Sequence, residues 1–157
     1  MDIKESQMAI INALAENEEA VSRLYEAYAL KFEEHRDFWV NLAIDEKNHA
    51  NWIHSLSSKI GQDSVLFNEN RFNSAAINTF HDYVEREIAK ARDQSMLLIT
   101  ALSTTLYIEE ALIERKYFEV LEGDSIELKN VLISLAQETQ CHLDRVRKLW
   151  SNQKKFK

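Results

Sequence analysis

The sequence contains no proline, two glycines and one cysteine among its 157 residues. Because proline and glycine interrupt regular structure more strongly than other residues, their near absence predicts long helices with very few tight turns. The single cysteine, Cys141, cannot form an internal disulfide. Without a Cys-x-x-Cys pair, the sequence also excludes a rubredoxin-type iron centre and a zinc ribbon. We therefore predict an all-α protein.

Long apolar runs and an excess of positive charge are also absent. No uninterrupted apolar run approaches the roughly 18 residues that are needed to span a bilayer, and residues 1–5 lack the apolar core of a signal peptide. We therefore expect a cytoplasmic protein that is not inserted in a membrane. The formal net charge of −7 opposes nucleic-acid binding as the main role.

The composition suits one domain with an apolar core. Hydrophobic residues make up 45% of the chain and charged residues 29%, so residues 1–157 can form a single domain with a polar surface. Apolar residues recur at intervals of three and four, which predicts four long amphipathic helices. Their expected ranges are about 5–32, 37–60, 95–121 and 124–150. Asp37, Gly61, Gly123 and an Asp124-x-x-Glu127 box mark the ends of these ranges.

The connections between these helices predict the topology. A short polar link makes the first two predicted helices antiparallel neighbours. Residues 61–94 form a long crossover to the third helix. Within it, Ser74 is expected to cap a short helix that ends near Ala91, and a new start is expected at 93–95. One long crossover between two helical hairpins is the connection found in ferritin-like four-helix bundles, and we predict that fold.

Polar residues interrupt the apolar stripes of three predicted helices. Glu46 and His49 stand in the middle of the stripe of the second helix, where hydrophobic residues are expected. Glu18 interrupts the apolar face of the first helix, and His142 lies on the inward face of the last. Burying an unpaired carboxylate is costly. A metal ion would compensate both a carboxylate and an imidazole, and a hydrogen-bonded polar core is the alternative.

The third predicted helix has two candidates for an inward carboxylate. Both Glu109 and Glu110 fall within the width of its apolar stripe. Spacing favours Glu110, because Ile113 and Tyr117 follow it at the same intervals at which apolar residues follow Glu18.

The last predicted helix lacks a ligand where one is expected. Thr139 occupies the position three residues before His142. Glu138 is one position off, but at four residues from His142 it lies on the same side of the helix, and a local π-bulge would bring it further into register. Three tyrosines are candidates to support the site, because a buried hydroxyl needs a hydrogen-bond partner. They are Tyr25, Tyr28 and Tyr117.

These segments resemble the rubrerythrin branch of the ferritin-like superfamily. Its di-metal site takes one Glu from each of two helices and a Glu-x-x-His from each of the other two. The segment Asn17-Glu18-Glu19-Ala20, followed by Tyr25, is similar to the family's first segment, and Asp45-Glu46-Lys47-Asn48-His49 is similar to its first Glu-x-x-His.

The other two segments resemble the family less evenly. In residues 107–118 the resemblance favours Glu109 as the ligand, whereas spacing favours Glu110, and both stay open. The segment Glu138-Thr139-Gln140-Cys141-His142 departs from the pattern, because threonine replaces the glutamate.

The resemblance implies a di-iron centre with oxidase or peroxidase activity in oxidative-stress or iron handling, and manganese or zinc would suit the same ligands. Electrons would come from a separate donor protein. We also expect a homodimer, because the apolar residues of the crossover helix can cover either their own bundle or that of a neighbour. The alternative is a bundle that binds no metal and serves as an interaction or structural protein. Thr139 is the residue that separates the two hypotheses.

Overall fold

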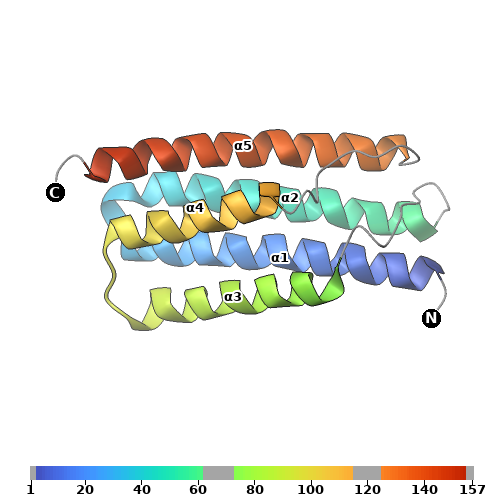
Figure 1. The fold of residues 1–157 in the computed structure, drawn as a ribbon, viewed down its shortest axis with the longest axis horizontal. Coiled ribbons are helices and arrows are strands. Elements are labelled where there is room, and N and C mark those ends of the chain that lie inside the picture. Colours follow the sequence, from blue (N-terminus) through green and yellow to red (C-terminus); the bar gives the residue numbers. More distant parts are fainter. Residues whose placement is uncertain (1–2, 62–72, 115–124, 155–157) are drawn as a thin grey trace.

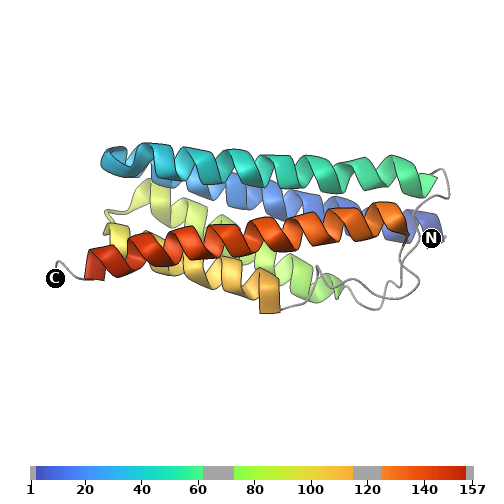
Figure 2. The same ribbon diagram turned by 90° about the horizontal axis from the view of Figure 1, so that it is seen from above.

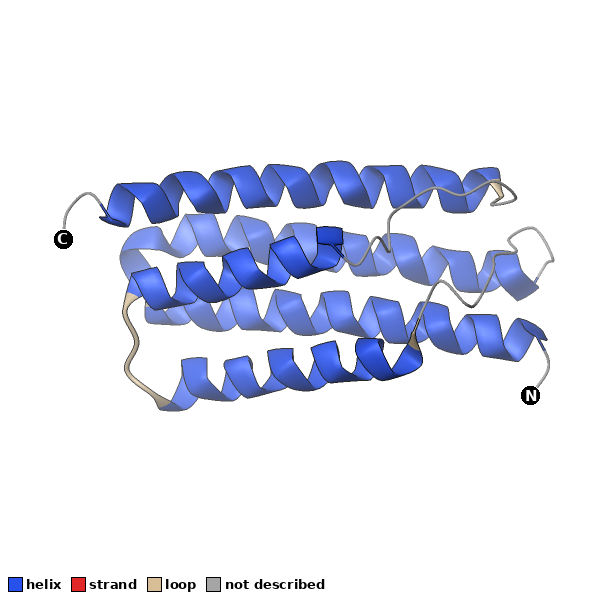
Figure 3. Cartoon of the chain, viewed as in Figure 1, coloured by secondary structure: helices blue, strands red, loops and turns tan. Residues whose placement is uncertain are grey.

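A computed structural model describes residues 3–61, 73–114 and 125–154, and this part of the chain is all-helical (Figure 3). Its elements are α1 (Ile3–Lys31), a 3-10 turn (Glu33–His35), α2 (Arg36–Gly61), α3 (Ser74–Asp93), α4 (Leu98–Glu114) and α5 (Ile126–Lys154). None of the described helices is long and apolar enough to cross a membrane.

The helices lie nearly parallel to one long axis (Figures 1 and 2). α1 and α2 form one antiparallel pair, and α4 and α5 form another. α3 packs against α1 and runs back along the bundle, so that α2 and α4 run in the same direction (Figure 1). α2 also contacts α5, which brings the two pairs together.

The link between the first two helices is tighter than predicted. The amide of His35 donates a hydrogen bond to the carbonyl of Phe32 at 2.9 Å. The amide of Arg36 then donates to the carbonyl of Glu33, so the 3-10 turn leads directly into α2. Asp37 therefore lies in the first turn of α2 and does not cap it, because the preceding turn already supplies the backbone continuity that a side-chain cap replaces. α2 includes Gly61, the predicted stop.

Two helix starts differ from the prediction by one residue. The side chain of Asn73, and not that of Ser74, accepts a hydrogen bond from the amide of Ala76 at 3.1 Å. Ser125 does the same for α5, because its hydroxyl accepts from the amide of Leu128 at 3.3 Å. Asp124 lies outside the described residues.

The predicted break between the crossover helix and the next helix is confirmed. α3 ends at Asp93, Gln94 is extended, and α4 begins at Leu98, three residues later than expected. Residues 62–72 of the predicted crossover and the predicted end of the third helix, near 121–123, lie outside the described residues.

The crossover helix is covered by its own chain. Five apolar side chains of α3 are buried: Ile77, Phe80, Val84, Ile88 and Ala91. Their burial removes our argument that this face covers a neighbouring subunit, and the homodimer stays an untested prediction.

The apolar interior is divided into two clusters by a polar layer. Along α1 one cluster includes residues 20–29 and the other residues 10–15, and Glu18 falls between them. Along α2, Glu46 and His49 fall between Ala43 of the first cluster and Ile53 of the second. On α5, Thr139 and His142 fall between the residues 128–135 and Val146. The buried polar side chains of these helices therefore share one level of the bundle.

Candidate metal centre

The polar layer gathers carboxylates and imidazoles from four helices. α1 supplies Glu18, α2 supplies Glu46 and His49, α4 supplies Glu109 and α5 supplies His142. Each of these side chains is at most 4% exposed. Glu46 and His49 are three residues apart in α2. Residues at this spacing lie one turn apart on the same helix face, so both side chains point into the layer.

Glu46 lies between two imidazole rings. Its Oε2 is 3.1 Å from Nδ1 of His49, and its Oε1 is 3.0 Å from Nδ1 of His142. The two rings are stacked, with centroids 5.4 Å apart. Nδ1 of His142 is also 3.5 Å from Oε1 of Glu109. One carboxylate thus faces both imidazoles, with each of its oxygens close to one ring nitrogen.

Three overlapping sets of potential ligand atoms occur among the described residues. In each set, the atoms lie within 4.8 Å of one another. The sets are Glu18, Glu46 and His49; Glu46, Glu109 and His142; and His49, Glu138 and His142. The first two share Glu46, and the third shares His49 with the first and His142 with the second.

The structure separates the two candidate glutamates of α4. Glu109 is fully buried in the layer. Glu110 is 43% exposed and forms a surface ion pair with Arg147 at 3.2 Å. The spacing-based preference for Glu110 as the inward residue is therefore wrong, because the apolar stripe is wide and only packing against α5 fixes the rotation of α4.

On α5, Thr139 has the buried position that a carboxylate ligand was expected to occupy, and the adjacent Glu138 carries the carboxylate. Thr139 is buried in the layer but offers no carboxylate. Glu138 is half-buried, and one of its carboxylate oxygens lies near the ligand nitrogens of His49 and His142. The position four residues before His142 thus brings a carboxylate to the layer without a π-bulge in the helix.

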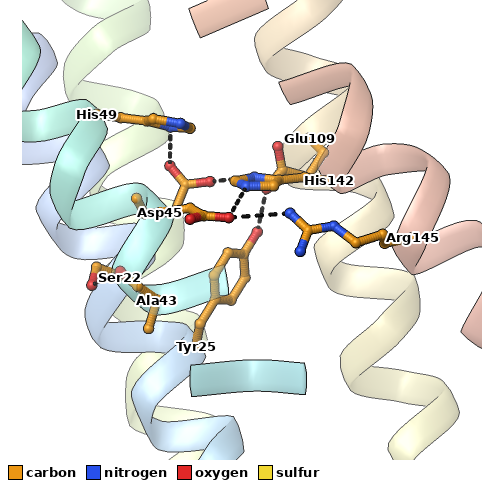
Figure 4. Close-up of polar contacts among 9 residues, drawn as sticks. Ser22, Tyr25, Ala43, Asp45, His49, Glu109, His142 and Arg145 are labelled. Atoms are coloured by element: carbon orange, nitrogen blue, oxygen red, sulfur yellow. Dashed lines mark hydrogen bonds and ion pairs between the residues drawn. The ribbon is translucent and has the colours of Figure 1, made fainter. Parts of the chain in front are cut away.

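The predicted supporting tyrosines have different surroundings. The hydroxyl of Tyr25 donates a hydrogen bond to Oε1 of Glu109 at 2.7 Å (Figure 4). Tyr28 is buried against Trp39, with ring centroids 4.8 Å apart. Tyr117 lies outside the described residues.

Asp45 and Arg145 support His142, and sequence reasoning missed both. Asp45 Oδ2 is 3.1 Å from Nε2 of His142 and 3.1 Å from Nη2 of Arg145, as Figure 4 shows. When Nε2 carries its proton it donates to Asp45, which leaves Nδ1 to face Glu46 and the interior of the layer. The only sequence signal was the position of Asp45 directly before Glu46, because its partners are about 100 residues away.

The buried charges perturb one another. Burial raises the pKa of Glu18 well above its usual value, and the nearby Glu46 carboxylate raises it further. Burial and the charge of Glu46 raise the pKa of Glu109 to about 7. Burial alone would lower the pKa of His142, but its hydrogen bonds with Glu109 and Glu46 outweigh burial and raise it to about 11.

The pKa of Glu46 is lowered, whereas the pKa of Tyr25 is raised. Burial acts to raise the pKa of Glu46, but hydrogen bonds with Glu18 and the two imidazoles outweigh burial and lower this pKa well below its usual value. Burial and the charge of Glu109 raise the pKa of the Tyr25 hydroxyl. Tyr25 therefore stays protonated and acts as a hydrogen-bond donor to Glu109.

Several buried potential ligand atoms have no hydrogen-bond partner. They include Oε2 of Glu18, Oε2 of Glu109 and Nε2 of His49. An unsatisfied buried polar atom costs about 1–3 kcal/mol, and more when the group is charged. Carboxylate oxygens and imidazole nitrogens without partners at one level of a bundle fit the coordination needs of a divalent transition metal.

Comparisons with protein-family models, with characterised proteins and with solved structures find no match to this chain.

Proposed function

We propose that the chain is a ferritin-like metalloprotein whose polar layer binds two divalent transition-metal ions. The observation that carries this proposal is the position of Glu46, shared by two sets of buried ligand atoms. Two antiparallel helix pairs joined by a returning helix also agree with a ferritin-like connection. Iron is the first choice of metal, and manganese and zinc suit the same ligands.

Each residue of the layer has a separate task in this proposal. Glu46 would be shared by the two ions, Glu18 and His49 would help to hold one ion, and Glu109 and His142 would help to hold the other. Asp45 fixes the ring of His142, and the Tyr25 hydroxyl orients Glu109. Bound iron would supply one-electron chemistry toward dioxygen or peroxide. Sustained turnover as a rubrerythrin-like oxidase or peroxidase needs electrons from a separate donor protein.

A polar core without metal is the second candidate. Two observations favour it: Thr139 offers no carboxylate, and His142 already has Asp45 and Glu46 as charged partners. Opposed to it are the unpartnered atoms of Glu18, Glu109 and His49. A satisfied core network would leave none of these atoms alone.

Metal stoichiometry distinguishes the two candidates. We expect protein purified without chelator, or reconstituted with iron(II), to contain close to two ions per chain by inductively coupled plasma mass spectrometry. Glu46→Ala should abolish stoichiometric metal. Glu110→Ala is the matched control, because it removes a neighbouring carboxylate that lies at the surface, and it should retain the metal.

Thr139→Glu adds a second arm to this experiment. A carboxylate at 139 would complete a second Glu-x-x-His, so we expect tighter binding of the second ion. In a core without metal the same substitution adds a buried charge and destabilises the fold. Negligible metal in the parent and in every variant would overturn the metalloprotein proposal in favour of the interaction bundle.

A further inference from the structure

An apolar cavity adjoins the polar layer. Its volume is about 30 Å³, and aliphatic side chains of α1, α2, α4 and α5 form most of its wall, among them Ile11, Ile53, Leu112 and Leu132. Glu18 also lines the cavity. The space therefore ends at a residue that belongs to the first set of ligand atoms.

Two polar residues occur among the described residues of the wall, Asn17 and Glu18. Asn17 lines the cavity, but its side-chain nitrogen donates to the carbonyl of Ile77 at 3.2 Å, and its oxygen is 3.1 Å from Nδ1 of His81. Both of its polar atoms are thus engaged with α3. The remaining polar group of the described wall is the Glu18 carboxylate, which is 4% exposed and whose Oε2 has no hydrogen-bond partner.

Size and polarity limit what can occupy the cavity. A single water molecule needs about 10–15 Å³, whereas benzene occupies engineered cavities of about 150 Å³. A buried water makes about three hydrogen bonds, and apolar cavities stay dry. Hydrogen peroxide needs hydrogen bonds as water does. Dioxygen is apolar, needs no partner and fits the available volume.

We propose that this cavity admits dioxygen to the Glu18 side of the metal centre and does not admit peroxide. The inference rests on the proposed function in one respect, namely that Glu18 is a metal ligand. The inference adds dioxygen as the oxidant that uses this cavity. Peroxide would need a polar entrance, because it requires hydrogen-bond partners.

Dissolved dioxygen is itself the probe in the first experiment. Because it is paramagnetic, it accelerates relaxation of nearby methyl protons. In metal-free protein with labelled methyl groups, we expect relaxation enhancements at Ile11, Ile53 and Leu132 that are several-fold larger than those at Leu42 and Ile88, which are equally buried in the other apolar cluster. Equal enhancements in both clusters would overturn the cavity as a dioxygen site, whether or not the protein binds metal.

A filled cavity provides the second experiment. Leu132→Phe should remove the enhancement and slow the oxidation of bound iron(II) by dioxygen several-fold, while oxidation by peroxide stays unchanged. Ile133→Phe is the control. The side chain of Ile133 is 45% exposed and does not line the cavity, so this substitution should change neither rate.

Other outcomes of the second experiment are also decisive. Equal slowing of both oxidants by Leu132→Phe, or slowing of neither, would overturn the proposal. Ile11→Phe fills the same space from α1 and replaces Leu132→Phe if that variant does not fold. Failure to bind iron would count against the proposed function alone, because the relaxation experiment needs no metal.

Discussion

At the scale of single residues, the polar layer stores protons that a cation would displace. Glu18 and Glu109 have raised pKa values because they are buried near Glu46. His142 has a pKa of about 11 because two carboxylates face it. Metal ligands must be deprotonated, so binding would release protons from these groups.

Stability of the metal-free protein should therefore fall as pH rises. The raised pKa of His142 stabilises the fold fully below its unfolded value of about 6.5 and is lost as pH rises toward about 11. Protonated Glu109 likewise favours the fold at low pH and loses this effect through about 7. The lowered pKa of Glu46 acts in the opposite sense, but only in acid, near and below its usual value.

We expect urea denaturation to give a free energy of unfolding lower by on the order of 1–3 kcal/mol at about pH 8.5 than at about pH 5.5 in the presence of chelator. With saturating metal the trend should reverse, because protons compete with the cation. A metal-free stability that rises steadily over this interval would contradict the pKa shifts.

The contact between Asp45 and His142 gives a second residue-scale prediction. Asp45→Ala leaves Nε2 of His142 without its acceptor, so we expect metal affinity to fall about 10–100-fold. Competition with a coloured chelator would measure the change. Asp144→Ala removes an exposed aspartate of α5 that pairs with Gln140, and it should leave the affinity within error of the parent.

At the scale of secondary structure, the start of α3 tests the assignment of the cap. Asn73→Ala removes the acceptor for the amide of Ala76 and should lower the free energy of unfolding by about 0.5–2 kcal/mol. Ser74→Ala changes the first helical residue, where no cap hydrogen bond is lost, and should have less than about 0.5 kcal/mol effect. A larger loss for Ser74→Ala would show that the cap lies at Ser74.

The sequence predicted helix existence better than helix rotation. Glu46 and His49 were found because their one-turn spacing is a local property of α2. The choice between Glu109 and Glu110 depends on how α4 is rotated about its axis when it packs against α5. The spacing of apolar residues along α4 does not specify this rotation. Asp45 and Arg145 lie on partly exposed rims, so they produce no apolar pattern, and their pairing with His142 follows only from docking α2 against α5.

At the scale of the whole molecule, the proposed metal centre joins both helix pairs. A ligand that binds the folded state alone stabilises it by about 2.7 kcal/mol at a concentration of one hundred times its dissociation constant. For a chain of this size, each kcal/mol shifts the melting temperature by about 2–4 °C. Removing the metal by dialysis against chelator should therefore lower the midpoint by on the order of 5–10 °C, measured by circular dichroism. In the Glu46→Ala variant, chelator should cause no measurable change in the melting temperature.

The near-complete burial of the proposed ligand side chains also has a consequence for the kinetics of metal release. A chelator in solution cannot reach an ion enclosed between two apolar clusters until the helix pairs separate, so release should follow the rate of local opening. The release rate would then be independent of chelator concentration and rise steeply with temperature, as unfolding rates do. A bound ion would therefore leave on the timescale of local opening of the bundle, and not on that of ligand exchange at the metal.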